Sequence, residues 1–359
     1  MHDTPRLAAE YVLPIRCERG DEPGALTEYL SRLAEWVDVT VVDGSDEEVF
    51  GRNAARWQRL VRHVAPEPGP GVNGKVLGVM TGLRLARHEA VVIGDDDVRY
   101  TYSELTRVVE ALGRADIVRP QNYFLERSWH ARWDTARSLV NRAFGSDYPG
   151  TLAVRRSVVL AAGGYCADAL FENLELLRTV RAAGGREYRA DDVFVGRVPP
   201  SSERFLAQRV RQAYDDFAQP VRLAAELSLL PALVWAVARP TRLIPMVAAA
   251  VGVAEIGRRR ANGATVFPAT SSLWAPVWMT ERAICVWLAV GARLSGGVVY
   301  RGRRVKLAAT FSRGFSTGRG LARVESEVPK TPSVLMMRPA RCSLMMKSRT
   351  PPSSGRWRV

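Results

Sequence analysis

Short apolar runs alternate with segments of helical periodicity over residues 10–220, and this alternation limits the possible folds more than any other feature of the sequence. Strands are expected at residues 11–15, 37–42, 90–93 and 116–119. Helices are expected between or after them, at residues 25–36, 75–86 and 102–112. Repeated strand–helix units predict an α/β fold, in which a mixed, mostly parallel sheet is covered by helices on both faces. Ligands of such sheets bind beyond the carboxyl ends of the strands.

Acidic side chains gather where two of the predicted strands end. Three consecutive aspartates, Asp95–Asp97, follow the strand at 90–93, and Asp43 follows the strand at 37–42. Mg²⁺ and Mn²⁺ prefer such hard oxygen ligands, and they usually keep coordination positions free for substrate phosphates. The aspartates therefore predict a metal ion held against a nucleotide diphosphate. A solvated acidic turn is the alternative.

The net charge of +14 lies almost wholly at the C-terminal end. Residues 300–359 contain 14 Lys or Arg and two Asp or Glu, so the first 299 residues carry only about +2. A nearly neutral body argues against a nucleic-acid partner, whereas a basic flank suits an anionic membrane surface. The four cysteines form no C-x-x-C pair, which predicts free thiols, and the N-terminus shows no secretory signal.

The composition changes after Pro220, where nearly uncharged segments replace the strand–helix pattern. These apolar segments lie at residues 223–238, 243–254 and 271–292. The first two are shorter than the ~20 residues of a spanning helix, and Glu281-Arg282 interrupts the third, so a buried helical subdomain is the alternative to a membrane anchor. We expect three regions: an α/β catalytic domain at 1–220, a membrane-associated helical region at 221–310 and a basic, disordered tail at 311–359.

Five patterns occur in order over about residues 10–215. They are Val12–Glu18, Val41–Asp46, Gly74-Lys75 with Gly82, the D-x-D signature Asp95–Asp97, and Gly150–Arg156 followed by Gly163-Gly164-Tyr165. In this order and spacing they resemble a family 2 glycosyltransferase of GT-A fold, near the membrane-associated ceramide glucosyltransferase-like group. Gly78 stands where that family usually has alanine.

The resemblance implies an inverting, metal-dependent hexosyltransferase at the cytoplasmic face of the cell membrane. It would move a sugar from a nucleotide-sugar donor to a lipid or envelope-glycan acceptor. Asp95 and Asp97 are expected to bind Mg²⁺ or Mn²⁺, with Asp97 the direct ligand. Pro14, Asp43, Lys75 and Asp95 are expected at the nucleotide site. An ordinary surface lysine is the alternative for Lys75.

One departure from the family pattern concerns the general base. Asn173 stands where the family has an aspartate base, and an amide does not take up the proton of an attacking hydroxyl. Glu172 is the first candidate for a replacement base, and Glu175, about one helical turn further, is the second. An acceptor that is already ionised, such as a polyprenyl phosphate, would need no base.

A second departure lies in Gln208–Gln212, which resembles the Q-x-x-R-W motif except that Gln212 replaces the tryptophan. Gln208 and Arg211 are expected to compensate the diphosphate charge, or else to lie on a solvated basic helix. The interleaved Trp129, His130 and Trp133 suggest a platform for acceptor or sugar, although a lone histidine is more often structural.

Two other functions remain open from the sequence. The departures favour a degenerate GT-A domain that binds nucleotide or scaffolds an envelope complex without turnover. A nucleotidyltransferase shares the fold and the need for metal, but it carries a glycine-rich basic loop after the first strand. Arg16–Asp21 matches such a loop poorly.

Overall fold

The computed structural model describes residues 5–21, 23–145, 147–300 and 303–310; the expected tail at 311–359 lies outside this part. The strands are β1 (Ala9–Ile15), β2 (Asp38–Asp43), β3 (Arg62–Val64), β4 (Ala90–Gly94), β5 (Val98–Arg99), β6 (Ile117–Phe124), β7 (Thr151–Arg155), β8 (Glu187–Arg197), β9 (Val298–Tyr300) and β10 (Arg303–Val305). The helices of the first 220 residues are α1 (Gly24–Trp36), α2 (Glu47–Trp57), α3 (Gly74–Leu85), α4 (Tyr102–Ala111), α5 (Trp129–Ala143), α6 (Arg156–Ala161), α7 (Glu172–Ala182), α8 (Ser202–Ala207), α9 (Arg209–Tyr214) and the 3₁₀ helix η1 (Asp215–Ala218).

The first eight strands form one mixed sheet in the order β3-β2-β1-β4-β7-β6-β8-β5. Strands β1 to β4 pair in parallel, and β6 pairs in parallel with β8. Strand β7 is antiparallel to both β4 and β6, and β5 is antiparallel to β8. The mixed, mostly parallel α/β sheet predicted from the sequence is confirmed. The carboxyl ends of β2, β4 and β8 consequently lie at one edge of the sheet, which we call the carboxyl edge.

Helices cover both faces of the sheet because successive strand residues point to opposite sides. Tyr11 and Leu13 face a core that includes residues of α1 and α4, whereas Val12 faces a core that includes residues of α3, α6 and α7. The near-continuous apolar runs of the central strands follow from this burial on both faces.

Two glycines let α3 lie directly on β1. A Cβ at Gly82 would be 2.3 Å from Val12 Cγ1, and a Cβ at Gly78 would be 2.9 Å from Pro14 Cβ. The glycine at 78, which departs from the family pattern, thus leaves room for Pro14. Asn73 caps the helix by accepting a hydrogen bond from the Lys75 amide (3.1 Å). This packing and this cap bring Lys75 to the carboxyl edge.

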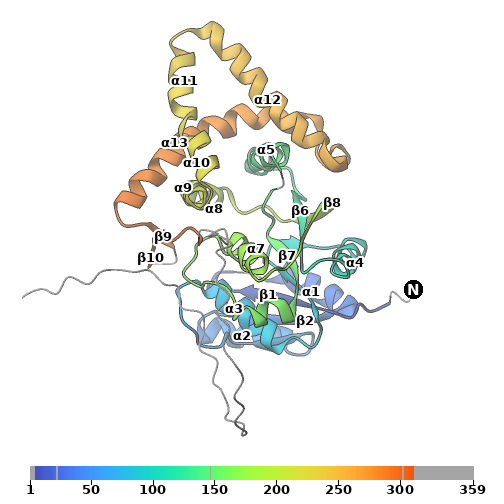
Figure 1. The fold of residues 1–359 in the computed structure, drawn as a ribbon. Coiled ribbons are helices and arrows are strands. Elements are labelled where there is room, and N and C mark those ends of the chain that lie inside the picture. The colour runs from blue at the N-terminus through green and yellow to red at the C-terminus, as the bar shows by residue number, and fades with distance from the viewer. Residues whose placement is uncertain (1–4, 22, 146, 301–302, 311–359) are drawn as a thin grey trace, which may run out of the picture.

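Apolar helices follow the sheet domain, as predicted. They are α10 (Pro220–Leu227), α11 (Leu229–Val237), α12 (Leu243–Arg259) and α13 (Ala275–Leu294), with the 3₁₀ helices η2 (Pro240–Arg242), η3 (Arg260–Thr265) and η4 (Ala269–Trp274). Helices α11 and α12 form a hairpin that projects away from the sheet, and α13 crosses beneath it (Figure 1). We call α10–α13 the helical region.

Helix α12 packs on α5 through a stripe of small residues. Ala250, Ala254 and Gly257 are the buried residues of α12. A Cβ at Gly257 would be 1.8 Å from the Leu139 carbonyl oxygen, so only glycine permits this approach of the two backbones. The opposite face of α12 is exposed.

The charges that interrupt the apolar segments point into the protein. Arg282 is 1% exposed and pairs with Asp216 (3.0 Å), while Glu226 is 6% exposed and pairs with Arg222 (3.0 Å). Arg222 also pairs with Asp216 (2.8 Å). Each of these buried charges therefore has an opposite charge beside it.

The chain returns to the sheet domain after β10. The amides of Leu170 and Phe171 donate to the carbonyls of Leu307 (2.9 Å) and Ala308 (2.8 Å). Arg178 of α7 donates to the Ala218 carbonyl in η1 (2.6 Å) and to the Thr310 carbonyl. One arginine thus holds the chain both where it enters the helical region and where it comes back from it.

Candidate functional site

Asp43, at the end of β2, is buried and interacts with polar side chains of the following loop, of α2 and of β3. It accepts from the amide and hydroxyl of Ser45 and from Asn53 Nδ2 (2.8 Å), and His63 Nε2 lies 3.1 Å away. Burial alone would raise the pKa of Asp43, but the hydrogen bonds from His63, Asn53 and Ser45 hold that pKa below its ordinary value. The ionised carboxylate fixes the shape of the loop after β2.

Cys17 contacts the loop after β2. Its amide donates to Ser45 Oγ (2.8 Å). Burial raises the pKa of its thiol to about 11, and the charges of Asp43 and Asp96 add to this rise. Cys17 and Cys285 form no disulfide in the part of the chain that the structure describes.

Asp95 and Glu172 share one lysine. Lys75 Nζ lies 2.5 Å from Asp95 Oδ1 and 2.5 Å from Glu172 Oε1, so the start of α3 joins the end of β4 to the start of α7. Burial alone would lower the pKa of Lys75, but the two carboxylates outweigh it and raise that pKa, which keeps the ammonium charged. Lys75 is thus paired with two carboxylates and is not an isolated surface lysine.

Asp97 pairs with Arg197 at the end of β8. Arg197 Nη2 lies 2.5 Å from Asp97 Oδ2 and 4.0 Å from Asp95 Oδ2. The Val198 amide also donates to the Asp97 carbonyl (2.8 Å), which holds the D-x-D turn against β8. The side chains of Asp95 and Asp97 are 25% and 24% exposed, so both reach the protein surface.

Gly150, just before β7, lies against the side chains of Asp95 and Arg197. A Cβ at position 150 would be 2.8 Å from Asp95 Oδ2 and 3.1 Å from Arg197 Cζ. The Gly150 carbonyl accepts from the Asp95 amide (2.9 Å), and its own amide donates to Asn122 Oδ1 (2.7 Å). The glycine in the predicted motif therefore provides space for the two charged groups.

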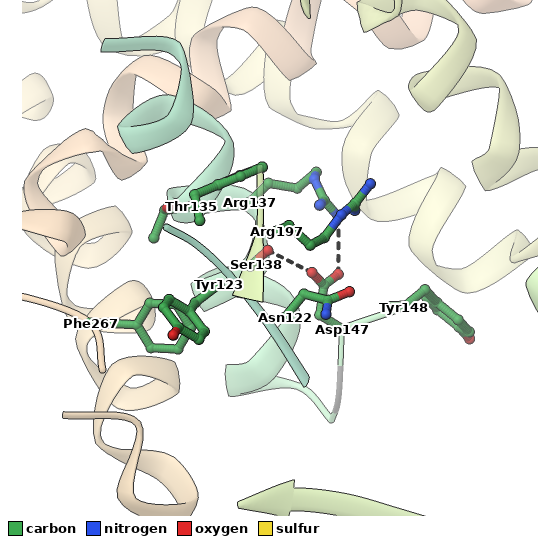
Figure 2. A pocket seen from close by; sticks show the side chains of 10 residues that line it. Asn122, Tyr123, Thr135, Arg137, Ser138, Asp147, Tyr148, Arg197 and Phe267 are labelled. Carbon is green, nitrogen blue, oxygen red and sulfur yellow. Dashed lines mark hydrogen bonds and ion pairs between the residues drawn. The ribbon is translucent and has the colours of Figure 1, made fainter. Parts of the chain in front are cut away.

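Arg197 also borders a small polar pocket between β6 and α5. Asn122, Ser138, Asp147 and Tyr148 are among its other lining residues, and Figure 2 shows Asp147 accepting from Ser138. The Ser138 hydroxyl and Arg137 both donate to Asp147 (2.6 and 2.9 Å). The pocket wall next to Arg197 is thereby held by ionised, hydrogen-bonded groups.

The remaining predicted site residues occupy different settings. Pro14 lies opposite Val42, one residue before the carboxyl end of β1. Glu175 is 3% exposed and accepts hydrogen bonds from the amide and hydroxyl of Thr310 (2.8 Å each). Gln208 joins α8 to α9, and Arg211 lies in α9.

The predicted aromatic platform forms a packed cluster. Trp129, His130 and Trp133 all contact Phe205 of α8, and His130 Nε2 is 2.9 Å from Ser128 Oγ. Trp129 remains 45% exposed. His130 thus packs as a buried histidine, and Trp129 presents the open part of this cluster.

Sequence reasoning did not identify Arg197, Asn53 or His63. Arg197 ends the apolar run Val193–Val195 and Gly196, so a charge at the carboxyl end of a strand was the available signal. Asn53 and His63 reach Asp43 through tertiary packing that leaves no local pattern.

Comparisons with known proteins identify no family for this chain. No family model matches it, and no curated protein matches it. Solved structures that resemble it include mannosyltransferase PcManGT from Pyrobaculum calidifontis in complex with GDP-Man and Mn²⁺ (TM-score 0.47, 21% identity, 79% of this chain and 88% of that chain). Two others are a mycobacterial protein (TM-score 0.37, 16%, 55% and 69%) and mannosyl-3-phosphoglycerate synthase from Rubrobacter xylanophilus (0.37, 16%, 57% and 74%). Likenesses this distant do not establish an activity for this chain.

Proposed function

We propose that the chain is a metal-dependent, inverting glycosyltransferase that takes its sugar from a nucleotide diphosphate. One observation carries the proposal: the carboxyl edge brings Asp95 and Asp97 together with two cations, Lys75 and Arg197. Such an edge is where α/β sheets bind ligands, and carboxylates with adjacent cations are the groups that hold a metal–diphosphate pair. The order of motifs along the chain also supports membership of glycosyltransferase family 2, near its ceramide glucosyltransferase-like group.

The donor set fits Mg²⁺ or Mn²⁺. Among the described residues, no group of three or more His, Cys, Asp or Glu side chains is placed to hold a metal ion. Asp95 and Asp97 offer two carboxylates that reach the surface, and Mg²⁺ is commonly bound by one or two carboxylates, with substrate phosphates and water completing its shell. Asp95 and Asp97 would hold the ion, which when bound would neutralise charge on the leaving diphosphate.

The chain's own residues would orient the donor. Lys75 and Arg197 carry positive charge at the place where negative charge grows as the glycosidic bond to phosphate breaks. Asp43 would act indirectly, since its carboxylate shapes the loop after β2 that would receive the nucleoside. Gln208, between α8 and α9, and Arg211 of α9 would be further contacts to the diphosphate.

The acceptor is proposed to be a lipid or envelope glycan at the cytoplasmic face of the membrane. Segments Pro220–Val237 and Pro240–Thr265 have the length and composition of membrane spans, and only 11% and 17% of their most apolar stretches are buried in the protein. The core helices of a soluble protein bury their apolar residues, whereas Trp235, Ile244 and Leu288 are 61%, 75% and 54% exposed. A lipid bilayer is the partner that this surface fits.

A metal-dependent thermal-shift assay tests the proposal. The full chain in detergent would be heated with a panel of nucleotide sugars, with and without Mn²⁺, while release of nucleoside diphosphate is measured. We expect one sugar nucleotide with Mn²⁺ to raise the melting temperature by about 5 °C. Asp97→Ala should lose this rise, while Asp192→Ala, which removes a surface ion pair with Arg107, should keep it.

The outcome separates turnover from binding alone. A shift together with release of nucleoside diphosphate supports an enzyme. A shift without release under any condition supports the degenerate nucleotide-binding domain, and the absence of any shift contradicts both.

A further inference from the structure

The residues expected to act as general base are engaged in other contacts. Asn173 donates to the Pro149 carbonyl (2.9 Å), so it fixes the loop before Gly150. Glu172 is ion-paired with Lys75 (2.5 Å), so its carboxylate is already engaged. Glu175 accepts from both the amide and the hydroxyl of Thr310. Transfer to a hydroxyl therefore needs a proton acceptor from elsewhere in the site.

Asp215 is a carboxylate whose surroundings suit that task. It opens η1, four residues after Arg211, and its Oδ1 is buried with no hydrogen-bond partner among the described residues. The Oε1 of nearby Gln212 is likewise buried and lacks such a partner. A buried acceptor atom without a partner is costly, and a catalytic role is one reason for a protein to keep one.

The charges around Asp215 set its affinity for a proton. Burial raises the pKa of Asp215 to about 7, and the neighbouring charge of Glu172 in α7 adds to the rise. Arginines of three other elements oppose it: Arg211 of α9, Arg282 of α13 and Arg222 of α10. A group that titrates near neutral pH can take up a proton and release it again within one catalytic cycle.

Asp215 also lies next to the donor machinery. The charge of Glu172 acts on Asp215, and Glu172 shares Lys75 with Asp95. The hydrogen bond from Arg178 to the Ala218 carbonyl (2.6 Å) holds η1 against α7. Asp215, the first residue of η1, is thereby carried on an element that is hydrogen-bonded to α7, the helix that begins with Glu172.

We propose that Asp215 is the general base for an acceptor hydroxyl, an inference that rests on the proposed glycosyltransferase function. The carboxylate takes the hydroxyl proton while the acceptor oxygen bonds to the anomeric carbon. The bond from that carbon to the diphosphate oxygen breaks, and its electron pair leaves with the nucleoside diphosphate. An acceptor phosphate, already ionised, would not need this residue.

Two acceptor probes and one amide variant test the inference. Full-length wild type and Asp215→Asn, with the sugar nucleotide that raises the melting temperature, would be given dodecyl glucoside as hydroxyl acceptor or dodecyl phosphate as ionised acceptor. With dodecyl glucoside, Asp215→Asn should lose about 10²- to 10⁴-fold in kcat/KM but keep the donor-induced thermal shift. The wild-type pH profile should show an acid limb near pH 7. Asp215→Glu should restore part of the rate, and Asp192→Asn should match wild type.

Stability checks the raised pKa of Asp215 independently of activity. Because the folded pKa of Asp215 is raised, its contribution to stability is full below the unfolded pKa and is lost as pH rises through about 7. Asp215→Asn should therefore melt above wild type at pH 8, and the difference should shrink towards pH 4.

The failures are distinguishable. If wild type and Asp215→Asn transfer sugar to dodecyl glucoside at equal rates, the role of Asp215 as general base is wrong, and the proposed function stands. If wild type transfers sugar to dodecyl phosphate but not to dodecyl glucoside, the role of Asp215 is again wrong and the proposed function stands. A wild type that neither binds nor turns over any nucleotide sugar overturns the proposed function, and the inference with it.

Discussion

The sheet domain and the helical region treat the same kinds of side chain in opposite ways. In the sheet domain apolar residues lie inside, and the carboxyl edge presents Asp95, Lys75 and Arg197 to solvent. In the helical region the charges of Glu226 and Arg282 are buried in pairs, and Ile244 and Trp235 face outward. The two regions thus differ in which side chains face outward, and this difference supports the proposed placement of the helical region in lipid.

This contrast explains why one chain can carry a polar site beside an apolar surface. The shared hydrophobic cluster that includes Leu174 of α7, Tyr214 of α9 and Ala289 of α13 joins the regions without exposing either interior. The following predictions test the contrast, from the largest expected effect to the smallest.

The outward face of the hairpin should dominate binding to membranes. Replacing Val234 and Ile244 by aspartate should lower partition into lipid vesicles by about 3 kcal/mol per substitution, because a charge replaces an exposed apolar side chain in the bilayer. Flotation of the purified chain with vesicles measures this. Leu60→Asp, at an apolar residue of the sheet domain that is 39% exposed, is the control and should still float. Equal flotation of all variants would show that the regions do not differ in this way.

The contact between α12 and α5 should depend on one glycine. Gly257→Ala places a methyl group against the Leu139 carbonyl and should destabilise the chain by about 3 kcal/mol, because backbones cannot yield as a flexible side chain can. Gly252→Ala, on the same helix with open space around it, should stabilise by up to about 1 kcal/mol. Chemical unfolding in detergent measures both. Similar values for the two variants would mean that α12 is not held on α5 as described.

At the carboxyl edge a small change should affect activity more than stability. Gly150→Ala should lower sugar transfer about tenfold, since its methyl group would displace Asp95 and Arg197 from their positions, and a tenfold loss corresponds to about 1.4 kcal/mol. Initial rates and melting temperatures of the variant measure the two effects. Gly145→Ala, whose methyl group would lie 3.9 Å from its nearest neighbour, should keep its rate.

The contribution of Asp43 to the free energy of unfolding should decrease at acidic pH. Its folded pKa is lowered, so its contribution is present above the unfolded pKa of about 4 and is lost as pH falls through the folded value. Asp43→Asn should be about 1 kcal/mol less stable than wild type at pH 6, and the gap should narrow below pH 4. Urea unfolding at several pH values measures the gap. A constant gap down to pH 2 would contradict the assignment.

The sequence predicted those elements whose apolar runs are buried on both faces. Strands β1, β2 and β4 and helices α1, α3 and α4 lie within two residues of their expected bounds. Strand β6 runs to Phe124, five residues past its expected end, because a register shift between Arg119 and Gln121 allows Pro120 within the strand. Strand β8 begins with charged residues, so its pattern was not recognised.

For the candidate site, local patterns located residues but not their partners. The D-x-D run and Lys75 stood out because each follows a strand or opens a helix. The pairing of Asp97 with Arg197, 100 residues away, and the setting of Asp215 depend on how β8 and η1 pack, which no short-range pattern encodes. Placement at a strand end is local information, whereas a side chain's neighbours are a property of the whole fold.

Arg178 holds Ala218 and Thr310 to the same helix, so both ends of the helical region are fastened at one point beside the site. If the helical region lies in lipid as proposed, its two attachments to one helix keep it from swinging freely on a single linker. The distance between the carboxyl edge and the bilayer surface would then be constant. Acceptors would be selected by how far their reactive group stands from the lipid surface, in addition to its chemistry.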